Sequence, residues 1–114
     1  MFIFDSLTAV TADSSANTAL NLTVISVPGQ SHYLYGFEMS ILGASTSSNI
    51  NIIIKDDTTS IYKTGLEAGV PIGSAQFRYF PVPIKITAEK SLSLAIDAGG
   101  TSVTIIGNLI YVTR

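Results

Sequence analysis

The single histidine of the chain, His32, is the first residue to weigh for chemistry. Its imidazole, next to Tyr33 at the entry to a predicted strand, has the atoms of a general base or a metal ligand. A histidine-rich metal site needs several imidazoles and a carboxylate around one ion, and one histidine cannot supply them. We therefore expect His32 to be a surface or rim histidine without a catalytic role.

Carboxylates are the next candidates. Asp56 and Asp57 are adjacent and could contribute to a Ca²⁺ site, which takes about six to eight oxygen ligands. The alternative is a solvated turn at a hairpin tip, where aspartate caps its own backbone. We expect a turn at Asp56 and Asp57, and another turn at Asp97, which precedes a glycine pair. Glu38 lies on the strand face opposite an aromatic stripe, so we expect a surface or interface acid.

The motifs of nucleophilic and phosphate chemistry are absent from the sequence. There is no cysteine, and no serine stands in a Gly-x-Ser-x-Gly turn. The pair Gly99-Gly100 leads into a predicted strand instead of a helix, so it does not form a phosphate-binding loop. A cupin-type enzyme is the remaining enzymatic alternative, and its metal ligands are missing. We expect no enzymatic activity and no cofactor.

Aromatic residues gather around one arginine. Phe77, Tyr79 and Phe80 flank Arg78, and Tyr62 belongs to a neighbouring predicted strand. Aromatic rings beside an arginine can stack on sugars or bases. Because Phe77 and Phe80 have opposite parity on one short strand, we expect core packing with some burial at an interface.

The elements that position these residues are strands. Apolar residues recur with a period of two, and a helical period is hardly seen. One such stripe is Tyr33, Tyr35, Phe37, Met39 and Ile41. Turn signals divide the chain into predicted strands at 7–10, 19–27, 31–42, 49–55, 60–64, 76–80, 82–88, 91–97 and 101–113. This spacing, with a long crossing loop at 65–75, predicts an all-β, two-sheet antiparallel jelly-roll sandwich of about eight strands. An immunoglobulin-like sandwich is the alternative.

Composition narrows the function. The 114 residues, weighing 12.0 kDa, are 46% hydrophobic but only 12% charged, with a net charge of −2. About a quarter of residues are charged in an ordinary soluble domain. The net charge gives no basic field for nucleic acid, and no apolar run approaches the roughly 20 residues that a membrane helix needs. We expect one domain over 1–114, with 1–18 as an N-terminal arm or an edge strand.

The second half of the chain resembles a known group of proteins. A hairpin over 50–62 is followed by a glycine-rich crossing loop, a proline-flanked strand at 80–86, alternating strands at 90–96, and a final strand at 101–111 with glycine ahead of an aromatic residue. This order of elements is similar to that of the small jelly-roll head decoration (cement) proteins of tailed bacteriophages.

The resemblance implies a virion protein that is made in the host cytoplasm and lies on the outer surface of the capsid. Its partners would be the major capsid protein and two further copies of itself in a homotrimer, which binds and stabilises the assembled head shell. Low charge suits a surface that is covered on assembly. The candidate interface residues are Phe2, Ile3, Phe4, Tyr62, Phe77, Tyr79, Ile106 and Ile110. The alternative is a carbohydrate- or receptor-binding jelly roll of a phage tail or fibre, which would use Tyr33, Tyr35, Tyr62 and Tyr79 if they cluster.

Overall fold

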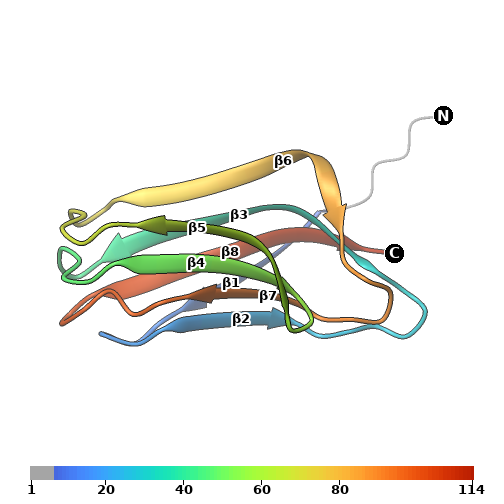
Figure 1. The fold of residues 1–114 in the computed structure, drawn as a ribbon, viewed down its shortest axis with the longest axis horizontal. Helices are drawn as coiled ribbons and strands as arrows, with labels where there is room; N and C mark the ends of the chain where they lie inside the picture. Colours follow the sequence, from blue (N-terminus) through green and yellow to red (C-terminus); the bar gives the residue numbers. More distant parts are fainter. Residues whose placement is uncertain (1–6) are drawn as a thin grey trace.

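The computed structural model describes residues 7–114, which form eight β-strands and no helix (Figure 1). The strands are β1 (Thr8–Asp13), β2 (Leu20–Val24), β3 (His32–Leu42), β4 (Ile50–Asp56), β5 (Thr59–Leu66), β6 (Ala75–Lys85), β7 (Leu92–Ile96) and β8 (Thr104–Thr113). The candidate interface residues Phe2, Ile3 and Phe4 lie outside the described residues.

Two four-stranded antiparallel sheets pack face to face, in the orders β1-β8-β3-β6 and β2-β7-β4-β5. We call them the first and the second sheet. The pairs β1–β8, β2–β7, β3–β6 and β4–β5 show that the chain runs as one long hairpin, rolled so that successive pairs alternate between the sheets. This is the jelly-roll arrangement, which confirms the predicted fold class and excludes the immunoglobulin-like strand order.

The predicted strands 76–80 and 82–88 are in fact one strand, β6, which runs through Pro81 and Pro83. Because β6 is the outermost strand of the first sheet, its prolines remove no donor that a neighbour on that side requires. The pairing of β6 with β3 also shifts register between Leu34 and Gly36, so the proline segment bulges away from the ladder.

The same irregularity corrects the predicted stripe on β3. Phe37, Met39 and Ile41 are buried as expected, but Leu34 replaces Tyr35 in the core. The register shift between Leu34 and Gly36 changes which parity faces inward. Tyr33 and Tyr35 are therefore only half-buried.

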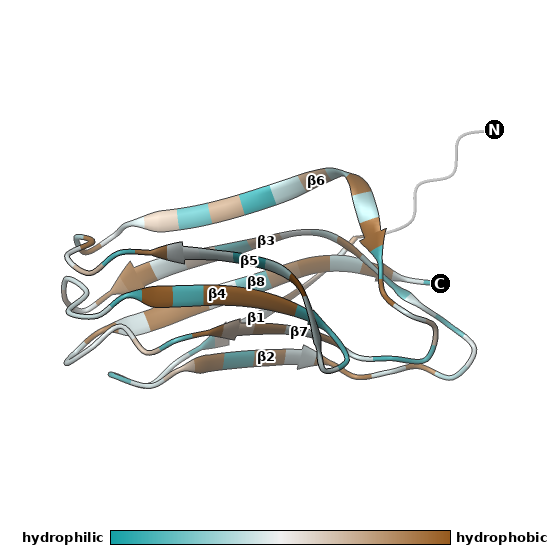
Figure 2. Ribbon diagram, viewed as in Figure 1, coloured by the Kyte–Doolittle hydropathy of each residue, from teal (hydrophilic) through white to brown (hydrophobic). Residues whose placement is uncertain are grey.

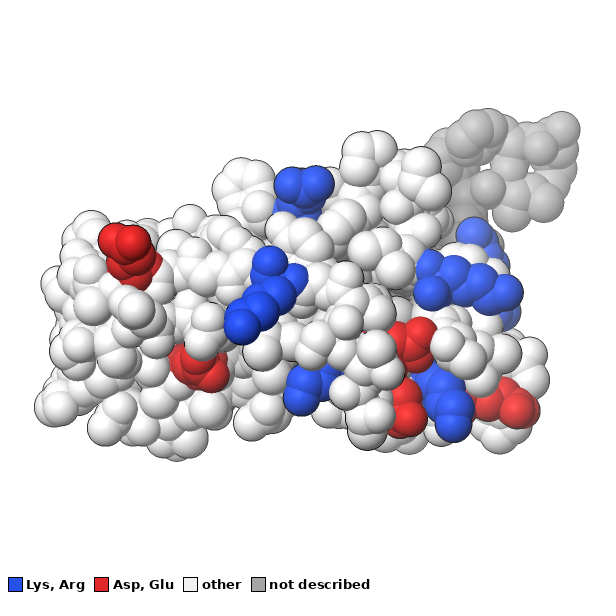
Figure 3. Space-filling view, in the orientation of Figure 1, with Lys and Arg blue, Asp and Glu red and all other residues white. Residues whose placement is uncertain are grey.

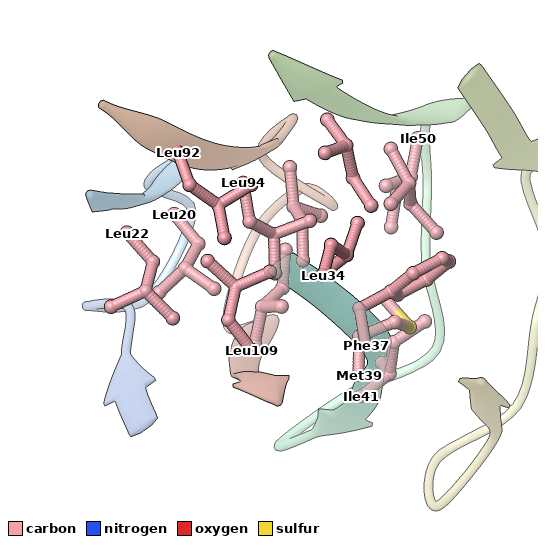
Figure 4. Packing of buried hydrophobic residues seen from close by; sticks show 14 of the residues in the cluster. Leu20, Leu22, Leu34, Phe37, Met39, Ile41, Ile50, Leu92, Leu94 and Leu109 are labelled. Carbon is pink, nitrogen blue, oxygen red and sulfur yellow. The ribbon is translucent and has the colours of Figure 1, made fainter. Parts of the chain in front are cut away.

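The core lies between the sheets and is filled by branched aliphatic side chains around Phe37 (Figure 4). Leu109 of β8 and Leu94 of β7 approach each other from opposite sheets. Gly107 lets the sheets come close, because a Cβ atom there would lie 2.3 Å from Cδ2 of Leu20. Strand β8 is central in the first sheet, and its side chains alternate between the core (Ile105, Leu109) and the outer face of the sheet (Ile106, Ile110).

Charge is concentrated at one end of the sandwich. The turns β2–β3, β4–β5 and β6–β7 lie at the end that holds the C-terminus (Figure 1). Figure 3 shows acidic and basic side chains clustered together at that end, with single charged groups separated by wide uncharged areas over the rest. Among residues 7–114, seven of the 13 charged side chains belong to strands and six to loops or the C-terminus, so strands and loops are both poor in charge.

Candidate interaction surface

Four of the candidate interface residues share one surface, the outer face of the first sheet. Phe77 and Tyr79 belong to β6, and Ile106 and Ile110 to β8. Across β3, Gly36 pairs with both Tyr79 and Ile110, so these side chains lie level with one another on the same side. The side chains that alternate with them along β3 and β8, such as Phe37 and Leu109, point the other way, into the core. Phe77 is 62% exposed and Tyr79 51%, while the two isoleucines are half-buried.

Tyr62 does not join them. Its ring is half-buried and packs on Phe37 and Phe80, with ring centroids 5.8 and 5.5 Å apart. The aromatic group expected around Arg78 is therefore divided. Tyr62 and Phe80 line the seam between β5 and β6, and the exposed rings of Phe77 and Tyr79 lie 5.6 Å apart on the outer face.

A line of hydrogen bonds crosses this outer face from edge to edge. The hydroxyl of Thr11 in β1 donates to Oδ1 of Asn108 in β8 at 2.6 Å, and Nδ2 of Asn108 donates to Oε1 of Glu38 in β3 at 3.4 Å. The Tyr79 hydroxyl in β6 donates to Oε2 of the same carboxylate. One side chain from each of the four strands thus fixes the next.

The hydrogen bond to Glu38 raises the pKa of Tyr79 above its ordinary value of 10.0, helped by partial desolvation and by the negative charge of the carboxylate. Ionising the phenol would remove the donor and place two negative charges together. The tyrosine therefore stays a neutral donor throughout the physiological range.

Gly36 explains how the Tyr79 ring reaches this place. A Cβ atom at Gly36 would lie 2.6 Å from Cδ1 of Tyr79 and 2.6 Å from the carbonyl oxygen of Arg78. The ring lies over the glycine that it pairs with, and any side chain there would push β6 away. Sequence reasoning missed Gly36, Asn108 and Thr11, because their roles depend on pairings between distant strands.

The outer face of the second sheet has a different character. Its side chains are mostly amides, hydroxyls and lysines, such as Asn51 of β4 and Lys63 of β5. The backbone N–H and Nδ2 of Asn51 donate to Oδ2 of Asp97 at 3.0 and 2.8 Å. Asp97 therefore fixes the start of β4, in addition to the turn-forming role expected of it. The two faces of the sandwich are chemically unequal, and the aromatic one is the first sheet.

His32 is not a rim histidine, contrary to the expectation. It is 1% exposed, with Nδ1 2.7 Å from Oγ1 of Thr113 and Nε2 2.7 Å from the carbonyl oxygen of Ile25. A carbonyl can only accept, so Nε2 carries the proton and Nδ1 accepts from the threonine hydroxyl. The histidine ties the β2–β3 loop to the last strand and has no room for substrate.

Asp56 links two turns. Its Oδ2 accepts from the backbone N–H and the hydroxyl of Thr87 at 3.0 and 2.7 Å. Asp57 follows with a left-handed backbone (φ 57°), as a tight hairpin tip requires. Within residues 7–114 no group of three or more His, Asp or Glu side chains is arranged to hold a metal ion. The described part of the chain also contains no helix long and apolar enough to cross a membrane.

Comparison with known proteins gives only distant similarity. No protein-family model matches the chain, and no curated protein matches its sequence. A chain from work on CBM4 structure and function is 17% identical, with a TM-score of 0.45, and the alignment covers 98% of this chain and 74% of that one.

Two viral proteins are similar to a comparable degree. A chain from infectious bursal disease virus, Gx strain, is 16% identical over 96% of this chain, with a TM-score of 0.47, and the match spans only 32% of that chain. The Tobacco streak virus coat protein is 11% identical, with a TM-score of 0.39, and the match covers 95% of this chain and 86% of the coat protein. At these scores the likenesses add nothing to the jelly-roll fold already evident from the strand order, and no function is transferred from them.

Proposed function

We propose that this protein is a structural virion protein, a capsid decoration protein that binds the assembled head shell of a tailed phage and stabilises it, acting as a homotrimer. The observation that carries the proposal is the outer face of the first sheet, where Phe77, Tyr79, Ile106 and Ile110 lie around a single hydrogen-bonded acid, Glu38. Interface centres are rich in aromatic residues and poor in unpaired charge, as this face is.

The inequality of the two sheets supports the first sheet as the one that meets the shell. The lysines and amides of the second sheet remain solvated without difficulty, whereas Phe77 and Tyr79 expose large rings. The line of hydrogen bonds from Thr11 to Tyr79 holds the Tyr79 ring in place, and Phe77 lies against that ring, so little side-chain entropy is lost on docking. The partner on this face would be the major capsid protein.

The stabilisation needs no covalent chemistry. A protein that binds only the assembled shell shifts the equilibrium toward that shell by mass action. Three linked subunits that dock together multiply a weak contact into a tight one. If truncating one exposed aromatic residue costs about 2 kcal/mol in a single contact, the loss over a trimer is about 6 kcal/mol.

The test compares variants of the two faces for binding to shells purified from the encoding phage without this protein. Phe77→Ser with Tyr79→Ser should abolish cosedimentation, and should leave shells as heat-sensitive as undecorated ones. Ile61→Ser, at an exposed isoleucine on the second sheet, is the matched control and should bind normally. Normal binding by the double variant, or no binding by the unaltered protein, would refute the proposal.

A second candidate function, glycan binding, rests on the same exposed pair. Phe77 and Tyr79 offer adjacent rings for stacking, and Glu38 and Asn108 have hydrogen-bonding capacity beside them. The four tyrosines first considered do not form such a cluster, since Tyr62 faces the seam. A glycan array separates the two functions. Binding to a sugar that Asn108→Ala weakens, without binding to shells, would favour the second.

A further inference from the structure

The two open edges of the sandwich carry opposite charge. One edge is formed by β5 and β6, the outermost strands of the second and first sheets, and the other by β1 and β2 (Figure 1). We call them the β5–β6 edge and the β1–β2 edge. Every charged side chain on β5 and β6 is a cation: Lys63, Arg78 and Lys85. The one charged side chain on β1 and β2 is Asp13.

Arg78 is the central cation of the β5–β6 edge. Because it alternates with Phe77 and Tyr79, its side chain leaves the outer face and enters the seam toward β5. Its guanidinium carbon lies 6.0 Å from the Tyr62 ring centroid and 5.7 Å from that of Phe80. The rings hold the guanidinium group in an exposed position, and no carboxylate among residues 7–114 forms an ion pair with it.

Apolar side chains accompany the charges on both edges. On β6, Val82 is 79% exposed, in the segment that bulges away from β3. At the β1–β2 edge, Leu7 precedes β1 and Ile25 follows β2, and both side chains are more than half exposed. Figure 2 shows hydrophobic and hydrophilic residues alternating along β6, so this edge combines both kinds of contact.

We infer that the β5–β6 edge of one copy binds the β1–β2 edge of the next copy, with Arg78 facing Asp13, the one charged side chain of β1 and β2. Such a contact joins two different surfaces, so each added copy offers the same free edge again. It closes into a ring when the rotation between copies divides a full turn. Only the number of copies, three, rests on the proposed function.

These edges are better suited to a second copy of the chain that docks through side chains than to an added strand that extends a sheet. Pro81 and Pro83 interrupt the donors of β6, and Lys85 ends it, which are features that protect an edge from strand addition. Side chains across the seam, rather than backbone ladders, would therefore make the contact. Except for Asp13, which pairs with Ile106 at the margin of that face, the outer face of the first sheet is left free for the shell.

The test is made on the free protein, so it does not depend on any shell. Sedimentation equilibrium in low salt should give a multiple of the 12.0 kDa chain mass. Arg78→Glu and Asp13→Arg should each weaken association about fivefold, because an exposed attraction becomes a repulsion. The double variant, with both charges exchanged, should recover most of the loss, and 0.5 M salt should weaken the unaltered assembly.

Lys90→Glu is the matched control, since it makes the same change of charge in the exposed β6–β7 turn and should associate normally. Thermal unfolding of each variant identifies any loss that comes from misfolding, and Arg78→Gln checks the contribution of ring stacking. A monomer at all concentrations, single variants that associate normally, or losses that add in the double variant would overturn the inference. Shell binding through the other face would be unaffected by that result.

Discussion

Replacing His32 by phenylalanine tests the two hydrogen bonds by which this buried side chain joins the β2–β3 loop to β8. Phenylalanine nearly preserves the ring volume and its edge contact with Tyr111, whose ring centroid lies 5.7 Å away. It removes both hydrogen bonds, to Ile25 and to Thr113. The substitution therefore isolates the polar contribution of the histidine from its packing.

The expected loss follows from the surroundings of the two partners. Each hydrogen bond contributes about 1 kcal/mol net, and more when a partner is left buried and unsatisfied. The Ile25 residue is 76% exposed, so water can replace the lost donor there, and the Thr113 hydroxyl can rotate. We expect His32→Phe to lower the free energy of unfolding by about 2 kcal/mol. His32→Ala adds a cavity, for a total of about 4 kcal/mol.

Urea unfolding followed by circular dichroism measures these values, and an unchanged urea dependence would show that the unfolded states are comparable. Thr113→Val removes only one bond and should cost about 1 kcal/mol. Combined with His32→Phe, it should add almost nothing, because the bond is already lost. If His32→Phe is as stable as the unaltered protein, the two hydrogen bonds do not have the assigned role.

Three further outcomes are expected at other positions. Ultraviolet titration should show one phenol that ionises above pH 10 and is absent from Tyr79→Phe, and Glu38→Gln should lower the pKa of that phenol. The stabilisation that this hydrogen bond gives is complete below the unfolded pKa and is lost as pH rises through the raised folded pKa. Gly36→Ala should destabilise the fold by about 1–3 kcal/mol by displacing β6, as measured by thermal unfolding, and an unshifted melting temperature would contradict the close contact. Asp56→Ala should cost about 1–2 kcal/mol and speed hydrogen exchange at the Thr87 amide, whereas unchanged exchange would show that their bond is unimportant.

Local patterns predicted most of the strands. The alternation at Ile50, Ile52 and Ile54 and the turn at Asp56-Asp57 gave the β4–β5 hairpin nearly to the residue, because a hairpin is a local structure. The joining of β6 through Pro81 was missed, since only its place at a sheet edge makes the proline tolerable.

The candidate surface was predictable in part. Its apolar members stood out by parity, as Ile106 and Ile110 did on the last strand. The polar line did not, because Thr11 and Asn108 are 97 residues apart and nothing local relates them. His32 was misplaced for a similar reason: the bulge at Tyr35 reverses which parity faces the core, and a single sequence gives no sign of it.

The central place of β8 has a consequence for how the chain folds. In the first sheet β1 and β3 each pair with β8, the last of the eight strands along the sequence, and not with each other. The β4–β5 hairpin can form within microseconds and β3 can pair with β6, whereas β1 must wait for β8, which is distant in the sequence. During synthesis, therefore, β1 remains without its partner until β8 has left the ribosome, whereas the other sheet and the β3–β6 pair can form earlier.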